Sequence, residues 1–168
     1  EFSDFSEGWN NSQKILVILA HPDDPEFFCG GMISRWCELG HQVRYCLLTC
    51  GQRGSQDVNA TPVEVGRIRI KEQQEAGDIL GVKEIAYLDN MDGELFPDLN
   101  LRNSVIREIR KQKPDIVVTS DPRSYFTSPG RINHPDHRAA GMAVFEGIFP
   151  AAGNPCYKVD DGSGNELA

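Results

Sequence analysis

Two short segments of this sequence carry side chains that can bind a metal ion. The first, residues 20–26, reads AHPDDPE, and the second, residues 134–137, reads HPDH. Imidazole nitrogens and carboxylate oxygens suit a borderline divalent ion such as Zn²⁺. A set of two histidines and one aspartate would leave coordination positions open for water, which distinguishes a catalytic metal site from a structural one. The two segments together therefore predict a catalytic metal site.

Each segment has a simpler interpretation when it is considered alone. A single His-x-x-Asp pattern in a loop is more often a turn or helix-capping carboxylate beside a surface histidine. Two such segments are a stronger indication if the fold brings them to one place. A dinucleotide site is disfavoured, because Gly30-Gly31 stands in place of a Gly-x-Gly-x-x-Gly motif. A cysteine nucleophile is also disfavoured, because Cys29 and Cys50 would need a histidine that the metal already uses.

Alternating strands and helices must position these two segments. The continuously apolar run at 14–20 indicates a strand that is buried on both faces of a parallel sheet. Further strands are predicted at 42–49, 84–88 and 115–120. Helices are predicted at 31–39, 62–80, 101–111 and 135–149, and glycines follow the first two.

Four alternations of strand and helix predict an α/β fold. We expect a three-layer α/β/α Rossmann-like sandwich with a mostly parallel sheet and right-handed crossovers. In the common order 3-2-1-4-5 the first and fourth strands are neighbours, and a crevice opens beyond their carboxyl ends. Residues 20–26 follow the first strand, and residues 134–137 lie beyond the fourth. The site is therefore expected in this crevice, in a sheet of order near 3-2-1-4-5.

Length and composition are those of one ordinary globular domain. The chain has 168 residues, a mass of 18.7 kDa and 39% hydrophobic residues. A chain of this length buries roughly 70% of its unfolded surface around a single core. We expect a polar N-terminal arm at 1–13, the folded domain at 14–150, and a polar C-terminal tail at 151–168.

Charge and cysteine content restrict the partners and the compartment. The formal net charge is −8, so the average surface repels nucleic-acid phosphates and anionic lipids. The longest apolar run, 15–20, is too short to span a bilayer, and the first residues lack the features of a signal peptide. The five cysteines form no Cys-x-x-Cys pair, which disfavours a disulfide framework and a cysteine zinc site. These observations predict a cytoplasmic protein that binds no nucleic acid and has no membrane-spanning segment.

Four motifs, in this order, resemble the PIG-L/LmbE family of zinc-dependent de-N-acetylases. They are AHPDDPE at 20–26, TCGQRG at 49–54, the helical segment 72–81 that ends in AGDILG, and HPDH at 134–137. The resemblance covers about residues 14–150. It implies the Rossmann-like (LmbE-like) fold. It also implies hydrolysis of the acetamide of an N-acetylglucosamine-type sugar or conjugate, with release of acetate and a free amine.

The resemblance further implies a metal set and two catalytic side chains. His21, Asp24 and His137 would bind the metal, which would be Zn²⁺, with Fe²⁺ as the alternative. Asp23 would act as the general base and take a proton from the attacking water. His134 would stabilise the oxyanion and assist departure of the amine.

Three further residues receive roles from the same resemblance. Asp136, between the two histidines of the second motif, would orient His134 and raise its basicity. Arg53 and Asp92, in the loops after the second and third strands, correspond to positions that contact substrate in the family. Considered without the resemblance, Arg53 is equally well explained as a surface residue and Asp92 as a turn former.

The chain is shorter than the family pattern. Members of the family continue beyond the HPDH helix with strands and helices that complete the sheet and one wall of the pocket. Here the family pattern stops near 149–155, and we expect a sheet edge and a pocket wall to be missing. The alternative to an active enzyme is a truncated metal-binding domain with little or no catalysis, which acts as an oligomerisation or interaction module. A homo-oligomer would cover the open surface.

Overall fold

The computed structural model of this chain describes residue 9 and residues 11–167. Residues 1–8, 10 and 168 are outside the described part, and so is most of the N-terminal arm predicted at 1–13.

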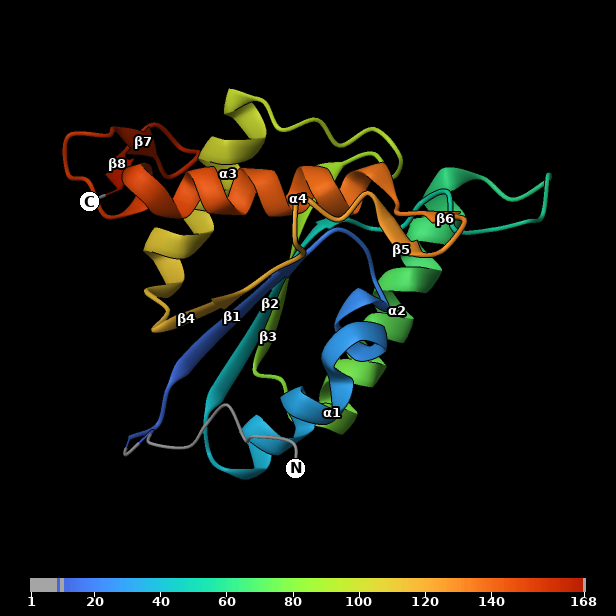
Figure 1. The fold of residues 1–168 in the computed structure, drawn as a ribbon, viewed down its shortest axis with the longest axis horizontal. Coiled ribbons are helices and arrows are strands. Elements are labelled where there is room, and N and C mark those ends of the chain that lie inside the picture. The colour runs from blue at the N-terminus through green and yellow to red at the C-terminus, as the bar shows by residue number, and fades with distance from the viewer. Residues whose placement is uncertain (1–8, 10, 168) are drawn as a thin grey trace.

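A four-stranded parallel sheet forms the centre of the molecule (Figure 1). Its strands are β1 (Lys14–Leu19), β2 (Gln42–Thr49), β3 (Glu84–Asn90) and β4 (Ile116–Val118), in the order β3-β2-β1-β4. All three strand pairs are parallel. The predicted α/β fold is therefore confirmed, and so is the order of its first four strands. Among the described residues no fifth strand extends this sheet, so β4 is an edge strand.

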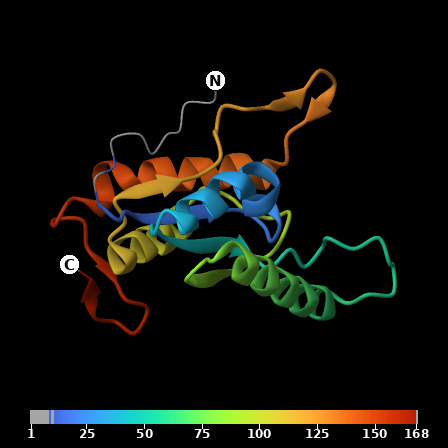
Figure 2. The same ribbon diagram turned by 90° about the horizontal axis from the view of Figure 1, so that it is seen from below.

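Helices cover both faces of the sheet (Figures 1 and 2). The helices α1 (Asp24–Glu38) and α2 (Pro62–Leu80) form one outer layer, and α3 (Leu99–Gln112) and α4 (Pro135–Glu146) form the other. Residues 15, 17 and 19 of β1 pack with Trp36 of α1, whereas residues 16 and 18 pack with Val105 of α3 and Val144 of α4. Because strand side chains alternate between faces, one apolar run supplies two cores.

The helix α2 begins and ends where the sequence predicts. Thr61 accepts a hydrogen bond from the backbone of Glu64, whose side chain accepts one from the backbone of Thr61, so the two residues form a capping box. Gly81 follows the helix with φ of 85°, in the left-handed region that a glycine adopts at low cost.

Other predicted bounds are wrong. The helix α1 begins at Asp24 rather than at Gly31, because Pro25 lies in its first turn, where the missing N–H needs no partner. Strand β4 covers Ile116–Val118, which is shorter than the predicted 115–120. The helix α4 ends at Glu146, before the predicted end at 149, and the π-helical turn η1 (Gly147–Ala152) follows it.

A hairpin that the sequence analysis did not predict connects β4 to α4. Its strands are β5 (Phe126–Ser128) and β6 (Arg131–Ile132), which pair antiparallel. Asn133 closes the base of the hairpin, because its backbone N–H donates to the carbonyl oxygen of Tyr125 and its side-chain amide donates to that of Ser124. This hairpin brings the chain directly to His134, where the second histidine motif begins.

The segment expected as a polar tail packs against α3. After η1, the short strands β7 (Val159–Asp160) and β8 (Glu166–Leu167) form a hairpin. Ala151 and Val159 are 2% and 4% exposed and contact Ile106. We call the guanidinium of Arg110 and its acceptors the Arg110 cage. Its acceptors are the backbone carbonyl oxygens of Ala151, Ala152, Asn154, Tyr157 and Leu167.

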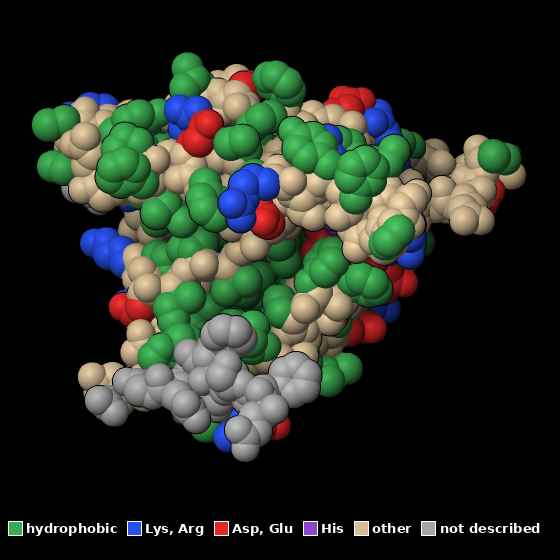
Figure 3. Space-filling model, in the orientation of Figure 1, with side chains coloured by type: hydrophobic (Ala, Val, Ile, Leu, Met, Phe, Trp, Pro, Cys, Tyr) green, Lys and Arg blue, Asp and Glu red, His purple; other side chains and the backbone are tan. Residues whose placement is uncertain are grey.

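Hydrophobic side chains gather over β4 and the C-terminal half of α4 on the face shown in Figure 3. Met142, Phe145, Ile148 and Phe149 are between 39% and 81% exposed. Together with residues 117–123 they line a hollow of about 930 Å³.

Among the described helices, none combines the length and the hydropathy that crossing a bilayer requires.

Candidate metal centre

His21 follows β1 directly and lies among three carboxylates. Its Nε2 atom is 3.1 Å from Asp92 Oδ1 and 3.2 Å from Asp136 Oδ2, and its Nδ1 atom is 3.4 Å from Asp24 Oδ2. The residue is 9% exposed. Asp24 also accepts a hydrogen bond from the backbone N–H of His21, 2.9 Å away, which fixes the turn between the two side chains. A buried imidazole with this many acidic neighbours indicates a cation-binding centre.

His137 reaches the same place from the first turn of α4. Its Nε2 atom is 3.1 Å from Asp24 Oδ1, and its Nδ1 atom is 3.1 Å from Asn133 Oδ1. His21, Asp24 and His137 each offer one ligand atom, and these three atoms lie within 4.8 Å of one another. The structure thus brings together the three residues that the resemblance identified as metal ligands. We call these three residues, with Asp92 and Asp136, the histidine centre.

The donor set of the histidine centre fits a divalent ion. Ligand atoms that surround a tetrahedral zinc ion at about 2.0–2.2 Å lie about 3.3–3.6 Å from one another. His21 Nδ1 lies 3.4 Å from Asp24 Oδ2 and His137 Nε2 lies 3.1 Å from Asp24 Oδ1, so each imidazole is near that spacing from one oxygen of Asp24. The second nitrogen of each imidazole contacts an oxygen, from Asp92 and Asp136 for His21 and from Asn133 for His137. Metal-bound histidines are held in this way by an outer acceptor.

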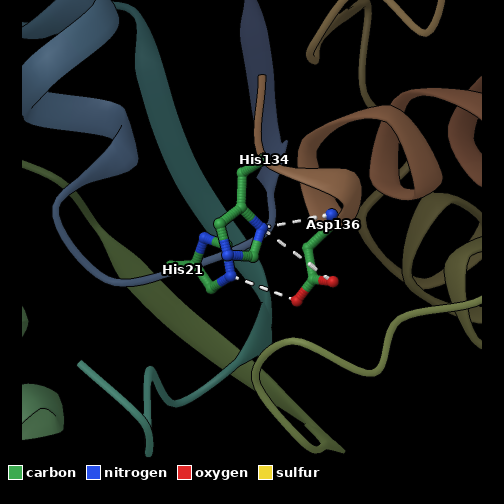
Figure 4. Close-up of side chains that lie close together, drawn as sticks. All are labelled: His21, His134 and Asp136. Atoms are coloured by element: carbon green, nitrogen blue, oxygen red, sulfur yellow. Dashed lines mark hydrogen bonds and ion pairs between the residues drawn. The ribbon is translucent and has the colours of Figure 1, made fainter. Parts of the chain in front are cut away.

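A second triplet shares His21 and is formed with His134 and Asp136 (Figure 4). Its ligand atoms also lie within 4.8 Å of one another. The Asp136 carboxylate, however, already accepts from the backbone N–H groups of Gly93, 2.7 Å away, and Leu95, 3.3 Å away. His134 Nδ1 accepts a hydrogen bond from the backbone N–H of Asp136. These atoms have protein partners, which favours an orienting role for Asp136.

The electrostatics of the centre are dominated by its carboxylates. Burial opposes a charge on His21, but hydrogen bonds to Asp136 and Asp24, with the charges of Asp24 and Asp92, raise the pKa of His21 to about 10. Burial also opposes a charge on Asp24, yet its contacts with His137 and His21 hold the pKa of that carboxyl well below its usual value. The centre therefore carries negative charge that a proton on His21 or a bound cation can offset.

His134 caps the N-terminus of α4 and is more accessible than the other two histidines. Its side chain is 42% exposed, and its ring centroid lies 4.7 Å from that of His21. Burial lowers the pKa of His134, and the nearby His21 and His137 lower it further, although Asp136 and Asp92 partly offset this. A half-exposed imidazole that is mostly neutral near pH 7 can exchange a proton with a bound molecule.

Asp23 lies outside the buried cluster. Its side chain is 67% exposed, and one of its oxygens accepts from Arg69 Nη2, 2.9 Å away. Beside it is a cavity of about 180 Å³, which Arg69 and Gln73 also line. The Asp23 carboxylate is thus accessible to solvent, and the next residue in the chain, Asp24, is one of the three candidate metal ligands.

Arg53 and Asp92 are brought into contact, but in different surroundings. Asp92 is 8% exposed and belongs to the histidine centre through its contact with His21. Arg53 is half exposed: its backbone N–H donates to Asp92 Oδ2, its guanidinium donates to the carbonyl oxygen of Asp92, and it forms an ion pair with Glu94. Asp92 is therefore a buried neighbour of a candidate ligand rather than a simple turn former.

Asp136 contacts two histidines of the site, His21 and His134. The sequence analysis assigned Asp136 to orient His134, yet its carboxylate is 3.2 Å from His21 Nε2 and 4.0 Å from His134 Nδ1. The residue is fully buried, and its two backbone donors turn the carboxylate toward the loop after β3 and toward His21. Asp136 is thus closer to His21, but its backbone N–H also donates to His134 and the charge of its carboxylate raises the pKa of His134.

Three residues of the site are absent from the sequence analysis. Asn133 orients His137, Arg69 holds the Asp23 carboxylate, and Gln73 accepts from the backbone N–H of Asp23. Only Asn133 had a local signal, because it directly precedes the second histidine motif. Arg69 and Gln73 are polar residues on a long helix, where such residues are usually solvent-exposed.

The family comparison matches most of the folded chain. Residues 16–148 match the model of the family described as PIG-L, GlcNAc-PI de-N-acetylase. The chain is 36% identical to the diacetylchitobiose deacetylase of Thermococcus kodakarensis, over 93% of this chain and 56% of that protein. It is 30% identical to the probable N-acetyl-alpha-D-glucosaminyl L-malate deacetylase 2 of Bacillus anthracis, over 82% of this chain and 60% of that protein.

A solved structure has the same fold over most of this chain. The N,N'-diacetylchitobiose deacetylase of Pyrococcus horikoshii, in complex with an inhibitor, superimposes with a TM-score of 0.77 and 33% identity. The match covers 88% of this chain and 53% of that one. The chain thus spans little more than half the length of these relatives. On its fold and on its matched residues, the chain belongs to the PIG-L (GlcNAc-PI de-N-acetylase) family.

Proposed function

We propose that this protein is a zinc-dependent hydrolase that removes the acetyl group from an N-acetylglucosamine-type sugar or conjugate. The products are acetate and the free amine. The observation that carries the proposal is the convergence of His21, Asp24 and His137 beyond the end of β1, where each offers one ligand atom within 4.8 Å of the other two. Two of the relatives are named as deacetylases of acetylated sugars or sugar conjugates. We take residues 14–150 as the catalytic domain.

His21, Asp24 and His137 would hold the ion, with Fe²⁺ as the alternative to Zn²⁺. When bound, a divalent ion supplies a nucleophile at neutral pH and polarises the amide carbonyl. Asp92 and Asp136 accept from His21, and Asn133 accepts from His137, so that each imidazole presents its other nitrogen to the ion.

Asp23 is the proposed general base. Its carboxylate is exposed to an incoming molecule, and its neighbour in the chain is a proposed ligand, so it can take a proton from the attacking water. Arg69 donates to one oxygen of this carboxylate at 2.9 Å, which helps to fix its orientation.

His134 is the residue proposed to stabilise the negative charge that develops on the amide oxygen during hydrolysis. Its half-exposed ring is next to His21, and its Nδ1 atom accepts from a backbone N–H, so Nε2 is free to donate toward the substrate. From this position it would stabilise the oxyanion and give a proton to the departing amine. Arg53 and Asp92 remain the proposed substrate contacts, with Arg53 at the exposed rim.

The compartment and the partners follow from the same proposal. The substrate is a small amino sugar or its conjugate. The five cysteines are unpaired, which suits a reducing compartment, and we place the enzyme in the cytoplasm.

Acetate release combined with metal analysis tests the proposal. Purified protein is loaded with Zn²⁺ or Fe²⁺ and assayed with N-acetylglucosamine and N,N'-diacetylchitobiose, with the Asp23→Ala variant as the matched control. We expect stoichiometric metal in both proteins, and acetate release that is about 10² to 10⁴ times faster in the wild type. Stoichiometric metal without turnover above the Asp23→Ala background would instead support the alternative, a metal-binding domain that serves as an interaction module.

A further inference from the structure

We propose that Gln73, on α2, is a positioning residue that holds Asp23 in the conformation required for proton transfer. The inference rests on the proposed function, because it concerns the general base of the proposed reaction. Gln73 lies within the motif at 72–81, but the sequence analysis gave it no role.

The backbone of Asp23 is in a conformation that needs support. Its φ and ψ angles are 80° and −27°, in the left-handed region. Lys113 is the other non-glycine residue of the described chain with a positive φ. Aspartate tolerates this region better than most residues, but such a conformation persists only where neighbouring contacts impose it. Asp23 is the N-cap of α1: its carbonyl oxygen accepts from the backbone N–H of Phe27, but its side chain forms no cap, so the helix leaves its N–H to another partner.

Gln73 supplies the missing contact. Its Oε1 atom accepts from the backbone N–H of Asp23 at 2.7 Å. The side chain is 2% exposed, so this bond is shielded from water. Its position on α2 ties the loop after β1 to the neighbouring helix, at a site 50 residues away in the chain.

The amide of Gln73 is itself fixed in one orientation. Its Nε2 atom donates to both carboxylate oxygens of Glu26, each 3.0 Å away. Glu26 also accepts from the hydroxyl of the buried Tyr45, at 3.1 Å. Reversing the amide would place its NH₂ group against the N–H of Asp23 and its oxygen against Glu26. The network therefore allows only one arrangement, with an acceptor aimed at Asp23.

This arrangement divides the support of Asp23 between two residues of α2. Arg69 contacts the carboxylate and the preceding carbonyl of Pro22, whereas Gln73 contacts the backbone N–H. Loss of the Gln73 contact would free the N–H side of the peptide between Pro22 and Asp23, while Arg69 still contacts its carbonyl oxygen and the carboxylate of Asp23. Because reaction rates are sensitive to displacements of about 1 Å, this would lower kcat more than it weakens substrate binding.

The first test compares Gln73→Met with Gln74→Met. Methionine preserves the length of the side chain and removes its hydrogen bonds to Asp23 and Glu26. Gln74 is an exposed neighbour whose side chain donates to Asp78 on the same helix. For acetate release from N,N'-diacetylchitobiose, we expect Gln73→Met to lower kcat about tenfold to hundredfold, with KM changed less than about twofold. Metal stoichiometry should stay at the wild-type value, and Gln74→Met should match the wild type.

Two further variants separate positioning from loss of structure. Tyr45→Phe removes a donor to Glu26 without touching Asp23, and we expect wild-type kcat. The double variant Gln73→Glu with Glu26→Gln exchanges the donor and the acceptor but keeps an acceptor for the N–H of Asp23, so it should recover most of the lost kcat. A kcat in Tyr45→Phe as low as that in Gln73→Met would overturn the proposal.

Hydrogen exchange at the Asp23 amide gives a readout that needs no activity. We expect exchange at this amide to become at least about tenfold faster in Gln73→Met and to stay unchanged in Gln74→Met. Unchanged exchange at Asp23 in Gln73→Met, or a kcat within about twofold of the wild type, would refute the positioning role. If the metal-loaded wild type releases no acetate, the proposed function fails, and the exchange result alone decides whether Gln73 holds Asp23.

Discussion

Two buried basic side chains of this protein, His21 and Arg110, have their positive charge offset by different kinds of group. His21, after β1, lies within 3.4 Å of oxygens from three carboxylates. Arg110, on α3, is 7% exposed and donates to backbone carbonyl oxygens of the C-terminal segment. One positive group is thus surrounded by charges, and the other by neutral dipoles.

The kind of group that surrounds a buried positive charge indicates whether the site is structural or functional. Carbonyl dipoles can satisfy the fixed donors of a guanidinium, and they tie the C-terminal segment to α3 without creating an exchangeable charge. The carboxylates around His21 exceed what one imidazolium can neutralise, so they favour an additional cation. We therefore interpret the Arg110 cage as structural and the histidine centre as a metal site.

Removal of one proposed ligand should have the largest effect. The His137→Ala variant should lose stoichiometric metal, and its acetate release should fall to the background of the protein-free reaction, because two ligands hold an ion poorly. Metal content by mass spectrometry and acetate release measure the two effects. Arg110→Met is the control and should keep its metal. A full equivalent of tightly bound zinc in His137→Ala would show that the other triplet, with His134 and Asp136, is the metal site.

Disruption of the Arg110 cage should affect stability alone. Arg110→Met leaves several buried carbonyl oxygens without a donor, and we expect the free energy of unfolding to fall by about 3 kcal/mol. Arg107→Met, which removes a more exposed contact with Asp160, should cost less than about 1 kcal/mol. Urea unfolding of the two variants measures the difference. Equal costs would mean that the cage does not fasten the C-terminal segment.

Removal of the metal should destabilise the wild type by a smaller amount. A ligand present at about 100 times its Kd stabilises the folded state by about 2.7 kcal/mol, so a chelator should lower the midpoint of thermal unfolding. The same chelator should leave the midpoint of His137→Ala unchanged. Equal shifts in the two proteins would show that the chelated ion binds outside the histidine centre.

Changes at the exposed rim should have the smallest effect on stability. Arg53→Met removes a half-exposed ion pair with Glu94, which should cost less than about 1 kcal/mol of unfolding free energy. If Arg53 binds substrate, KM should rise severalfold while kcat is unchanged, because the contact is made equally in the ground and transition states. Glu94→Gln is the matched control. An unchanged KM in Arg53→Met would restrict its role to bracing the loop that carries Asp92.

Much of the fold was predictable because its signals are local. The apolar run at 14–20, the capped helix at 62–80 and the alternation of elements do not depend on distant residues. The early start of α1 was missed, because the same His-Pro-Asp-Asp-Pro segment forms both the site and the first turn of the helix. The C-terminal segment was taken for a polar tail, because its packing depends on one arginine about forty residues earlier in the chain.

The sequence predicted which residues belong to the candidate site better than it predicted which of them contact one another. The two histidine motifs were expected at one crevice, because parallel strands end at the same edge of a sheet. Nearness in sequence suggested His134 as the partner of Asp136, but it could not show that the fold also brings the carboxylate to 3.2 Å from His21. Gln73 lies in the motif at 72–81 but received no role, because a single polar residue on an amphipathic helix gives no sign of burial.

The sequence by itself determined the fold class, the order of the first four strands and the edge of the sheet at which the histidines gather. These depend on hydrophobic periodicity and on the direction of parallel strands, which are properties of short segments. Only the tertiary structure decided which carboxylate faces which imidazole and how Asp23 is held. Those contacts join residues from β1, the loop after β3, α2 and α4, and their distances depend on how four separate elements pack together.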